Sequence, residues 1–426
     1  MMLRSVTLIL AVLMALSVLS TNNLTPAQKA SIATRFASEV KYNYAGYGQF
    51  SQDYDSICRA ELQSLAETPN DEDFGRRLLL LAHRLKDGHT SVSWNADVSV
   101  APFLTKRIGD SVFVSEVFSD EYRGKGVARG TEILQIDGMP VIEYGEKNVA
   151  PYIPSSTPQW SAFYPFSSIN LTKGERGLPL TITFKNRKGK EFTLTDHRDS
   201  PWSIINPDMS MKFDVLQGNI GLLKIPSFRA SCFDAQAFTD LFEKQILPTE
   251  ALIIDIRDNN GGNSQIADFI MQFIAHDSIP QGAWTQPEYK ASFASWGQKW
   301  HTDTVESQSL IPFHKQYPDL PEYDKPIILL VNSGTFSAAE NFAVLFRNAG
   351  RGKIVGVPTG GSTGNPIMID LGWGYYGVIC TRHEKLADGT EFIGAGIQPD
   401  VIEEETESFF FGKDNVIEAA LKELRK

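Results

Sequence analysis

Cysteine is scarce in this sequence, which has only Cys58, Cys232 and Cys380 among its 426 residues. The three are widely spaced, odd in number and include no C-x-x-C pair, so they indicate neither a disulfide framework nor a zinc site. Their spacing does not decide whether any two of them form a bridge. With 42% hydrophobic residues, a chain of this length can bury a stabilising core without disulfides.

Basic residues are also fewer than acidic residues. Lys and Arg number 40 against 51 Asp and Glu, a formal net charge of −11 that does not favour nucleic-acid binding. The Gly-rich stretch "GGSTGN" lacks the Lys of a phosphate-binding G-x-x-x-x-G-K loop. Asp255, Asp258 and Asp400 are isolated carboxylates without a His at ligand spacing. The sequence therefore predicts no cofactor and no metal.

Long apolar runs are absent except at the beginning, where the sequence reads "MMLRSVTLILAVLMALSVLS". One Arg precedes the apolar run and small or polar residues follow it, which is typical of an export signal. The run is short for a membrane span. We expect residues 1–22 to be a signal peptide, and the exported protein to be periplasmic or extracellular without a stable membrane span. An uncleaved anchor is the alternative.

The next part of the chain, residues 23–97, is predicted to be an N-terminal helical domain. A helix over 26–40 begins after Thr25, a suitable N-cap followed by Pro. A second helix over 71–85 has acidic residues at its start and basic residues towards its end, which matches the helix dipole. The turn Lys86-Asp-Gly88 then ends it.

Residues 98–200 change to short strands and turns. The stretch from Gly126 to Gly138 contains a Gly-rich turn, a strand and a tight Asp-Gly turn, and it resembles the core of a PDZ domain. PDZ domains bind chain termini as an added strand. Residues 148–176 are polar and aromatic without a clear period, and we expect them to form a long surface loop.

Residues 201–426 alternate strand-like apolar runs with helical stretches. The runs "NIGLLKIPSF", "ALIIDIRDNN", "PIILLVNSG" and "KIVGVP" are separated by helical patterns such as 264–274 and 338–346. This alternation predicts an α/β layer of buried, mainly parallel strands. Residues 280–325, with Trp284, Trp296 and Trp300, are too long for a plain connection and suggest a lid or part of a groove.

Ser337 lies where the strand-like run 326–331 turns into a helical stretch. The sequence Ser337-Ala-Ala-Glu340 fits a capping box, in which the Ser side chain binds a backbone N–H group. The same position would suit a nucleophile, because a helix N-terminus offers N–H groups and a positive dipole to an oxyanion. The local sequence does not separate these two interpretations.

Two further segments carry candidate chemistry. Paired glycines, Gly261 and Gly262, follow a buried strand and can turn backbone N–H groups towards a ligand, although such a turn is also common in plain α/β structure. His89 follows a helix end and has a side chain that titrates near neutral pH, although a lone loop His is usually only solvated.

Taken together, these segments closely resemble the tail-specific (C-terminal processing) serine peptidase family, including its tricorn-core branch. The resemblance rests on "LKDGHTSV", "IIDIRDNNGGN", "LVNSGTFSAAE", "VGVPTGGSTG" and "GAGIQPDV", which occur in this order around a PDZ-like insert. It covers nearly all of the chain after the signal segment. It implies an α/β fold with a crotonase- or ClpP-like peptidase core, an N-terminal helical domain and a PDZ-like domain.

The resemblance also implies roles for individual residues. Ser337 matches the nucleophile, and the N–H of Ala338 with that of Gly261 or Gly262 matches the oxyanion hole. Many relatives carry a general-base Lys in the turn after the nucleophile helix, but here that turn is "PTGGSTG", with Ser362 where the Lys would lie. The tricorn-like branch uses a His instead, and His89 fills that place. Glu391 is the candidate carboxylate that orients the His.

We therefore expect an exported serine endopeptidase that hydrolyses unfolded or C-terminally presented polypeptides, captured by the PDZ-like domain. The alternative is a non-catalytic protein on the same fold that holds a peptide or an apolar ligand, an interpretation favoured by the missing Lys. The sequence does not predict the oligomeric state.

Overall fold

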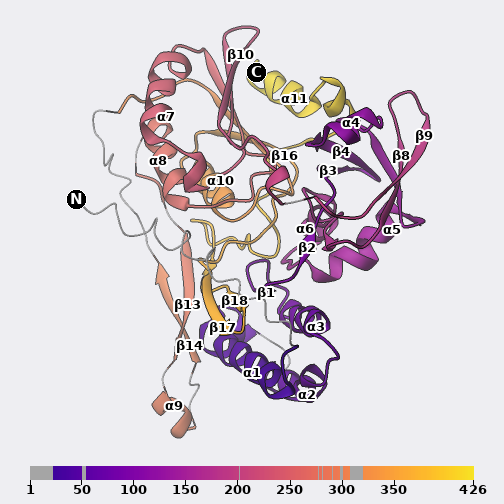
Figure 1. Ribbon diagram of the computed structural model, residues 1–426. Coiled ribbons are helices and arrows are strands. Elements are labelled where there is room, and N and C mark those ends of the chain that lie inside the picture. Colours follow the sequence, from indigo (N-terminus) through magenta and orange to yellow (C-terminus); the bar gives the residue numbers. More distant parts are fainter. Residues whose placement is uncertain are drawn as a thin grey trace.

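The computed structural model describes residues 23–49, 54–200, 202–276, 278–280, 282–289, 291–297, 301–307 and 320–426 (Figure 1). The predicted signal peptide, residues 1–22, lies outside the described residues. Within the described ranges, no helix has the length and apolar character needed to cross a bilayer.

Three helices open the described chain, in agreement with the sequence: α1 (Pro26–Asn43), α2 (Tyr54–Ala66) and α3 (Asp71–His83), with the short η2 (Tyr47–Gln49) between the first two. Thr25 caps α1 as expected, since its side chain accepts from the N–H of Gln28 while the Gln28 side chain accepts from the N–H of Thr25. The helices lie at the bottom of Figure 1, against strands from the far end of the chain. Those strands, β18 (Tyr375–Ile379) and β17 (Ile367–Gly372), form a sheet with β1 (Ser91–Trp94), which follows the helices, in the order β1, β18, β17.

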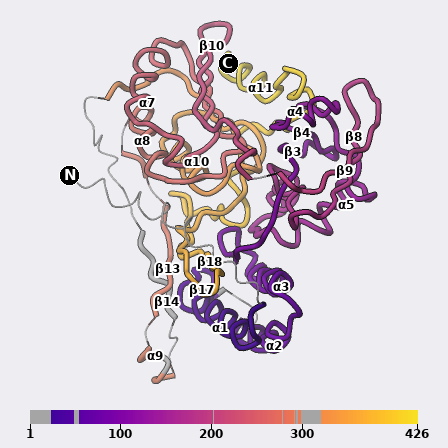
Figure 2. The backbone as a smooth tube through the Cα atoms, viewed as in Figure 1, coloured from indigo at the N-terminus to yellow at the C-terminus, as the bar shows by residue number. Residues whose placement is uncertain are grey.

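This arrangement joins the two ends of the chain in one hydrophobic core. Phe36, Phe74 and Leu78 of the helices are buried together with Leu371 and Ile379 of the sheet. In Figure 2 the indigo N-terminal helices accordingly lie beside the orange hairpin of β17 and β18. Helix α3 therefore leads directly into β1, and the short link between them, which contains His89, is tied to the C-terminal part of the chain.

A second sheet lies on the right of Figure 1 and is built by residues 98–200. Its antiparallel strand order is β3 (Phe103–Ile108), β4 (Ser111–Val117), β5 (Glu132–Ile136), β8 (Leu180–Lys185), β9 (Glu191–Asp196), with β6 (Met139–Pro140) also on β5. A core of its own includes Phe103, Ile133, Leu180 and Phe184. The remaining elements of this region are β2 (Val98–Ser99), α4 (Asp120–Gly124), α5 (Val141–Tyr144), η3 (Gly145–Val149) and β7 (Gly174–Glu175).

The prediction of a surface loop over 148–176 was wrong. This segment contains η4 (Ala150–Tyr152), α6 (Pro158–Phe163) and η5 (Tyr164–Phe166). The side chain of Trp160 is 3% exposed, and Thr157 Oγ1 donates to the carbonyl of Gly360 at 2.7 Å. No period was visible because each helix is only a turn or two long, so the aromatic side chains are buried individually rather than along one face.

The third and largest part is an α/β layer whose sheet has the order β10 (Lys212–Leu216), β11 (Ile220–Lys224), β12 (Ala251–Asp255), β15 (Ile327–Val331), β16 (Gly352–Gly356), β20 (Val401–Ile402). All neighbours are parallel except β10 and β11. One face is covered by α7 (Ala235–Leu241), α8 (Ser264–Ile274) and α10 (Ala338–Asn348), the other by α11 (Asn415–Glu423).

The sequence of these strands explains their place in the layer. Alternate side chains of β12 face opposite sides, so that Leu252 and Ile254 pack under α7, α8 and α10 while Ile253 packs under α11. Because both faces are covered, the strands have to be apolar over most of their length, as the first four residues of "ALIID" are. Short helices η6 (Trp202–Ile204), η7 (Ala230–Cys232), η8 (Phe242–Ile246) and η9 (Glu407–Phe411) complete the connections.

The insertion over 280–325 contributes the long hairpin of β13 (Ala283–Tyr289) and β14 (His301–Ser307), with α9 (Ala291–Ser295) between them. The hairpin pairs with β19 (His383–Glu384) and runs down beside the N-terminal helices in Figure 1. Trp284 lies under the guanidinium of Arg382, 4.0 Å from its ring centroid, and Trp296 is exposed. Trp300 and residues 308–319 lie outside the described residues.

Candidate active site

Ser337 stands immediately before α10, but its side chain does not cap the helix. Its backbone has φ 56° and ψ −125°, a left-handed conformation that is unusual for a residue with a side chain. The backbone N–H of Ser337 donates to the carbonyl of Ser362 at 3.1 Å, which holds the strained turn in place. The hydroxyl is therefore turned away from the helix end, contrary to the capping interpretation.

The hydroxyl of Ser337 meets the imidazole of His89. His89 Nε2 lies 3.0 Å from Ser337 Oγ, although the two residues are 248 positions apart in the sequence. His89 Nδ1 lies 2.7 Å from Ser362 Oγ on the opposite side of the ring. When Nδ1–H donates to Ser362, the Nε2 lone pair faces Ser337, which is the tautomer that can accept the serine proton.

The surroundings of His89 fix its ring and keep it neutral. The ring stacks on Phe336 with centroids 4.7 Å apart, and Phe336 in turn stacks on Trp160 at 4.1 Å. The backbone N–H of His89 donates to Asp87 Oδ1 at 2.9 Å. Burial lowers the pKa of His89 to about 4, because the charged imidazolium would lose its hydration. At neutral pH the imidazole is therefore an unprotonated base.

Glu340 binds the loop that carries Ser362. Its buried carboxylate accepts from the N–H of Gly361 at 2.7 Å, from the N–H of Ser362 at 2.8 Å and from the hydroxyl of Thr359. Burial raises the pKa of Glu340 to about 7, although these hydrogen bonds oppose the shift. The sequence pattern assigned Glu340 to a capping box, whereas in the structure it anchors the loop opposite His89.

Glu391, expected to orient His89, lies elsewhere. Glu391 Oε2 bonds His383 Nε2 at 2.8 Å, and Oε1 bonds Lys385 Nζ at 2.6 Å. Burial raises its pKa, but the hydrogen bonds from Lys385 and His383 outweigh that effect and lower it. The cause is local, since an antiparallel bridge pairs Lys385 with Glu391 and turns the carboxylate towards its own hairpin. The partner of His89 Nδ1 in the structure is Ser362.

The two glycines expected at an oxyanion hole differ in their hydrogen bonding. The N–H of Gly261 donates to Asn259 Oδ1 at 2.9 Å and is already engaged. The N–H groups of Gly262 and Ala338 have no acceptor among the described residues. Gly262, Ala338 and Ser337 line one cavity of about 420 Å³. The geometry therefore favours Gly262 over Gly261 as the partner of Ala338.

Gly261 has a different role, which is close packing. Its φ of +91° is a conformation that suits glycine, and a Cβ at this position would lie 2.8 Å from the backbone nitrogen of Ala338 and 2.8 Å from Ser337 Cβ. The turn after β12 thus touches the start of α10 directly. Only a residue without a side chain allows this approach.

An ion-pair network behind the glycine turn was not apparent in the sequence. The buried Lys106 of β3 lies 2.6 Å from Asp258 and 2.8 Å from Glu405. Asn332, at the end of β15, donates to Asp258 Oδ1 at 2.8 Å, and Arg257 lies 3.4 Å from Glu405. Asp258, expected to be an isolated carboxylate, therefore joins the sheet of residues 98–200 to the turn that carries the glycines.

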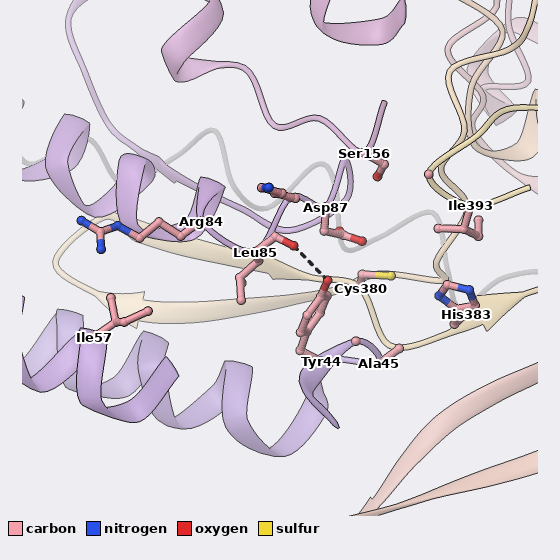
Figure 3. A pocket seen from close by; sticks show the side chains of 13 residues that line it. Tyr44, Ala45, Ile57, Arg84, Leu85, Asp87, Ser156, Cys380, His383 and Ile393 are labelled. Atoms are coloured by element: carbon pink, nitrogen blue, oxygen red, sulfur yellow. Dashed lines mark hydrogen bonds between the residues drawn. The ribbon is translucent and has the colours of Figure 1, made fainter. Parts of the chain in front are cut away.

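A larger cavity of about 610 Å³ lies on the other side of the link that holds His89. Figure 3 shows Tyr44, Asp87, Cys380 and His383 around it, with the hydroxyl of Tyr44 donating to the carbonyl of Leu85 at 3.3 Å. Neither Ser337 nor His89 lines this cavity. Ser337 and the two residues with free amides, Gly262 and Ala338, line the smaller cavity, and His89 reaches that site through its contact with Ser337.

A serine hydroxyl at a strained helix start, in contact with a buried neutral imidazole and beside two free backbone amides, is an arrangement that suits the chemistry of a serine hydrolase. Residues 219–402 match Peptidase family S41. The match covers less than half of the chain, and this part of the chain is similar to the family that the sequence resembles.

Known proteins and solved structures are also similar to this chain. A carboxy-terminal-processing protease of Bartonella bacilliformis is 27% identical over 244 residues, which cover 56% of this chain and 50% of that protein, so the match spans only half of the relative. The structure of mature CPAF complexed with lactacystin is 15% identical, with a TM-score of 0.68 and coverage of 94% of this chain and 98% of that one. A peptidase structure from Parabacteroides merdae is 18% identical, with a TM-score of 0.51 and coverage of 95% and 98%. At these identities the two structures confirm the fold alone.

Proposed function

We propose that the protein is a serine endopeptidase in which Ser337 is the nucleophile and His89 the general base. The observation that carries this proposal is the 3.0 Å contact between His89 Nε2 and Ser337 Oγ. It is supported by the burial that keeps His89 unprotonated at neutral pH. A base must be within hydrogen-bonding reach of the proton that it removes, and this contact meets that requirement.

The chemistry follows from the positions of these groups. Ser337 Oγ attacks the carbonyl carbon of the scissile bond while its proton moves to His89 Nε2. The negative charge that develops on the carbonyl oxygen is bound by the N–H groups of Gly262 and Ala338. His89 then protonates the leaving amine, which leaves an acyl group on Ser337. A water molecule, activated by His89, hydrolyses this ester and restores the serine.

We propose that Ser362 and Glu340 together take the place of a carboxylate at His89 Nδ1. The hydroxyl of Ser362 accepts from Nδ1–H and fixes the tautomer, while Glu340 fixes Ser362 through its backbone N–H. The Glu340 carboxylate also lies in the same buried region and stabilises the imidazolium that forms during attack. Ser362 and Glu340 act through His89 and are positioning residues.

For the substrate, we propose unfolded or C-terminally presented polypeptides. The name of the Bartonella relative, a carboxy-terminal-processing protease, supports this class of substrate. The separate antiparallel sheet of residues 98–200 supports a PDZ-like module that captures a chain terminus. The apolar segment within residues 1–22 supports export to the periplasm or the cell exterior. Mass spectrometry of the secreted protein would show an N-terminus near residue 23.

A non-catalytic binding protein is the second candidate. The observation that favours it is the absence, among the described residues, of a carboxylate bonded to His89 Nδ1. A relay without that charge stabilises the imidazolium less, and a weak base could leave the site able to hold a peptide without cutting it.

Labelling with a fluorophosphonate probe separates the two functions. We expect the wild-type protein to label and to degrade unfolded casein, and the Ser337→Ala and His89→Ala variants to do neither, because the probe requires an activated serine. A wild-type protein that is folded but neither labels nor cuts casein would establish the binding protein instead.

A further inference from the structure

Strand β17 leaves the loop opposite His89 and becomes an exposed edge. The chain is buried from Ser362 to Gly364, but residues 365–368 are all exposed. Strand β17 follows at once and is the last strand in the order β1, β18, β17. Ile367 and Met368 are 36% and 70% exposed, so apolar side chains project from both faces at the end of the strand that is nearest the site.

The edge of β17 lacks the features that usually protect an exposed strand edge from pairing with other chains. Exposed edges are commonly protected by charges, by early bulges or by a covering element, because their free N–H and C=O groups pair with other chains. The strand reads "IMIDLG", with Asp370 as its one charged residue, and its bulge comes only between Asp370 and Gly372. The first four residues pair regularly with β18, and no other strand pairs with β17 among the described residues.

The edge is continuous with the cavity of Ser337. Gly364, Asn365 and Pro366 line that cavity, and the next residue begins β17. The segment that leads from the cavity into β17 is held in place, since the carbonyl of Gly364 accepts from the N–H groups of Thr381 and Arg382. A chain paired with β17 would therefore enter the cavity along a fixed backbone.

We propose that an extended, unfolded segment of the substrate pairs with the outer edge of β17 and that this pairing places its scissile bond at Ser337. The proposal rests on the proposed peptidase function. In it, the site selects extended chains because they can form main-chain hydrogen bonds with β17. Side chains of the substrate that lie against Met368 are expected to be apolar. The edges of β10 and β20, with the exposed Val215 and Ile402, do not serve, because neither strand lines the cavity.

A second copy of the chain is the competing occupant of this edge. It is less well suited, since a protomer paired with β17 would stand across the opening lined by Gly364 and Pro366. The regular part of the strand is also short, because the bulge begins at Asp370.

The first experiment measures binding without cutting. In a Ser337→Ala background, a fluorescein-labelled unfolded casein peptide is titrated with the protein and its anisotropy recorded. We expect Met368→Lys to weaken binding about three- to fivefold, the size of one lost cross-strand pair. The matched control is Val215→Lys, at an apolar residue that is 57% exposed on another edge strand, and it should leave binding unchanged.

The second experiment tests the backbone pairing and does not depend on a variant that folds. Casein peptides N-methylated at successive positions lose one N–H each, and pairing with a strand edge predicts that affinity falls at alternate positions. Hydrolysis of a small nitrophenyl ester, too short to reach β17, should be the same for wild type and the control variant Val215→Lys.

The outcomes distinguish the two proposals. Casein cleavage with no effect of Met368→Lys or of N-methylation overturns pairing with β17 and leaves the peptidase intact. Alternating N-methyl effects in a protein that never cleaves casein overturn the peptidase and retain the strand. A change in sedimentation coefficient for Met368→Lys with unchanged peptide affinity overturns the substrate as occupant, in favour of a second copy.

Discussion

At the scale of residues, the central observation is that one serine satisfies two sequence patterns. The S-x-x-E pattern at Ser337 and Glu340 is shared by a capped helix and by a nucleophile, and only a distant group decides between them. That group is His89, whose contact with Ser337 depends on the tertiary fold. A positive φ at a residue with a side chain costs on the order of 1–3 kcal/mol, and the bonds that Ser337 makes to Ser362 and His89 maintain it.

A substitution at Ser362 tests whether its hydrogen bond positions the ring of His89. We expect Ser362→Ala to lower kcat about tenfold with little change in KM, since the loss of one hydrogen bond at Nδ1 loosens the ring and its tautomer. Steady-state kinetics with a peptide substrate measure both constants. The control is Thr363→Val at the adjacent buried hydroxyl, which has no hydrogen-bond partner among the described residues. An equal loss in both variants would mean that the loop is only perturbed.

The pKa shifts of Glu340 and His89 are opposite in sign, and they predict opposite changes in stability as the pH rises. The folded-state pKa of Glu340, about 7, exceeds its unfolded value, so the native state holds an additional proton between pH about 4.5 and 7. Its contribution to the free energy of unfolding therefore falls as pH rises through that window. The pKa of His89, about 4 when folded, lies below its unfolded value, so its contribution rises with pH between about 4 and 6.5.

The substitution Glu340→Gln removes one of these two contributions. Relative to wild type, we expect the slope of unfolding free energy against pH to become more positive by up to about 1.4 kcal/mol per pH unit between pH 5 and 6.5. Urea denaturation at several pH values measures this slope, and Glu391→Gln serves as a surface control. An unchanged slope would show that Glu340 is already ionised throughout the window.

At the scale of elements, the sequence predicted what periodicity and local turns determine. The apolar runs of β12 and β15, the caps and charges of α1 and α3, and the alternation of strands with α8 and α10 were all visible, because each depends on neighbours along the chain. The helices of 148–166 were not predicted, since they are too short to show a period. The pairing of Glu391 with His383 and Lys385 was also missed, because it depends on a bridge between two turns.

The turn after β12 offers a test of close packing between elements. Gly261→Ala puts a Cβ 2.8 Å from Ala338 N and Ser337 Cβ, at a φ of +91°. We expect a loss of about 2–4 kcal/mol of stability from strain and overpacking together, and loss of fluorophosphonate labelling because the start of α10 shifts. Denaturation midpoints and gel fluorescence measure the two effects.

The matched control for this turn is Gly138→Ala. Gly138 has a φ of +79°, but nothing lies within 4 Å of the place that a Cβ would occupy, so only the conformational cost of about 1–2 kcal/mol applies. Labelling of the Gly138→Ala variant should persist. Equal destabilisation of the two variants would mean that contact with α10 adds nothing.

At the scale of the whole molecule, the site is assembled from parts that are far apart in the chain. His89 follows the N-terminal helices, the glycine turn and Ser337 belong to the α/β layer, and the segment of Trp160 is joined to the sheet of residues 98–200. The family resemblance implied the order of these parts along the chain. The contacts that join them could not be read from the sequence, because Lys106 in β3 carries no local signal of its distant partners.

A substitution at Lys106 therefore tests whether contact with the sheet of residues 98–200 affects the labelling of Ser337. It is 6% exposed and pairs with Asp258 and Glu405, so Lys106→Met removes the paired cation of Asp258 and leaves Glu405 with Arg257 alone. We expect a loss of about 2–3 kcal/mol of stability and weaker labelling of Ser337, since Asp258 lies three residues before Gly261. Lys185→Met in the same sheet removes an exposed pair with Glu132 and should cost at most about 1 kcal/mol. Destabilisation with full labelling would show that the network holds the sheet in place without affecting the turn that carries Gly262.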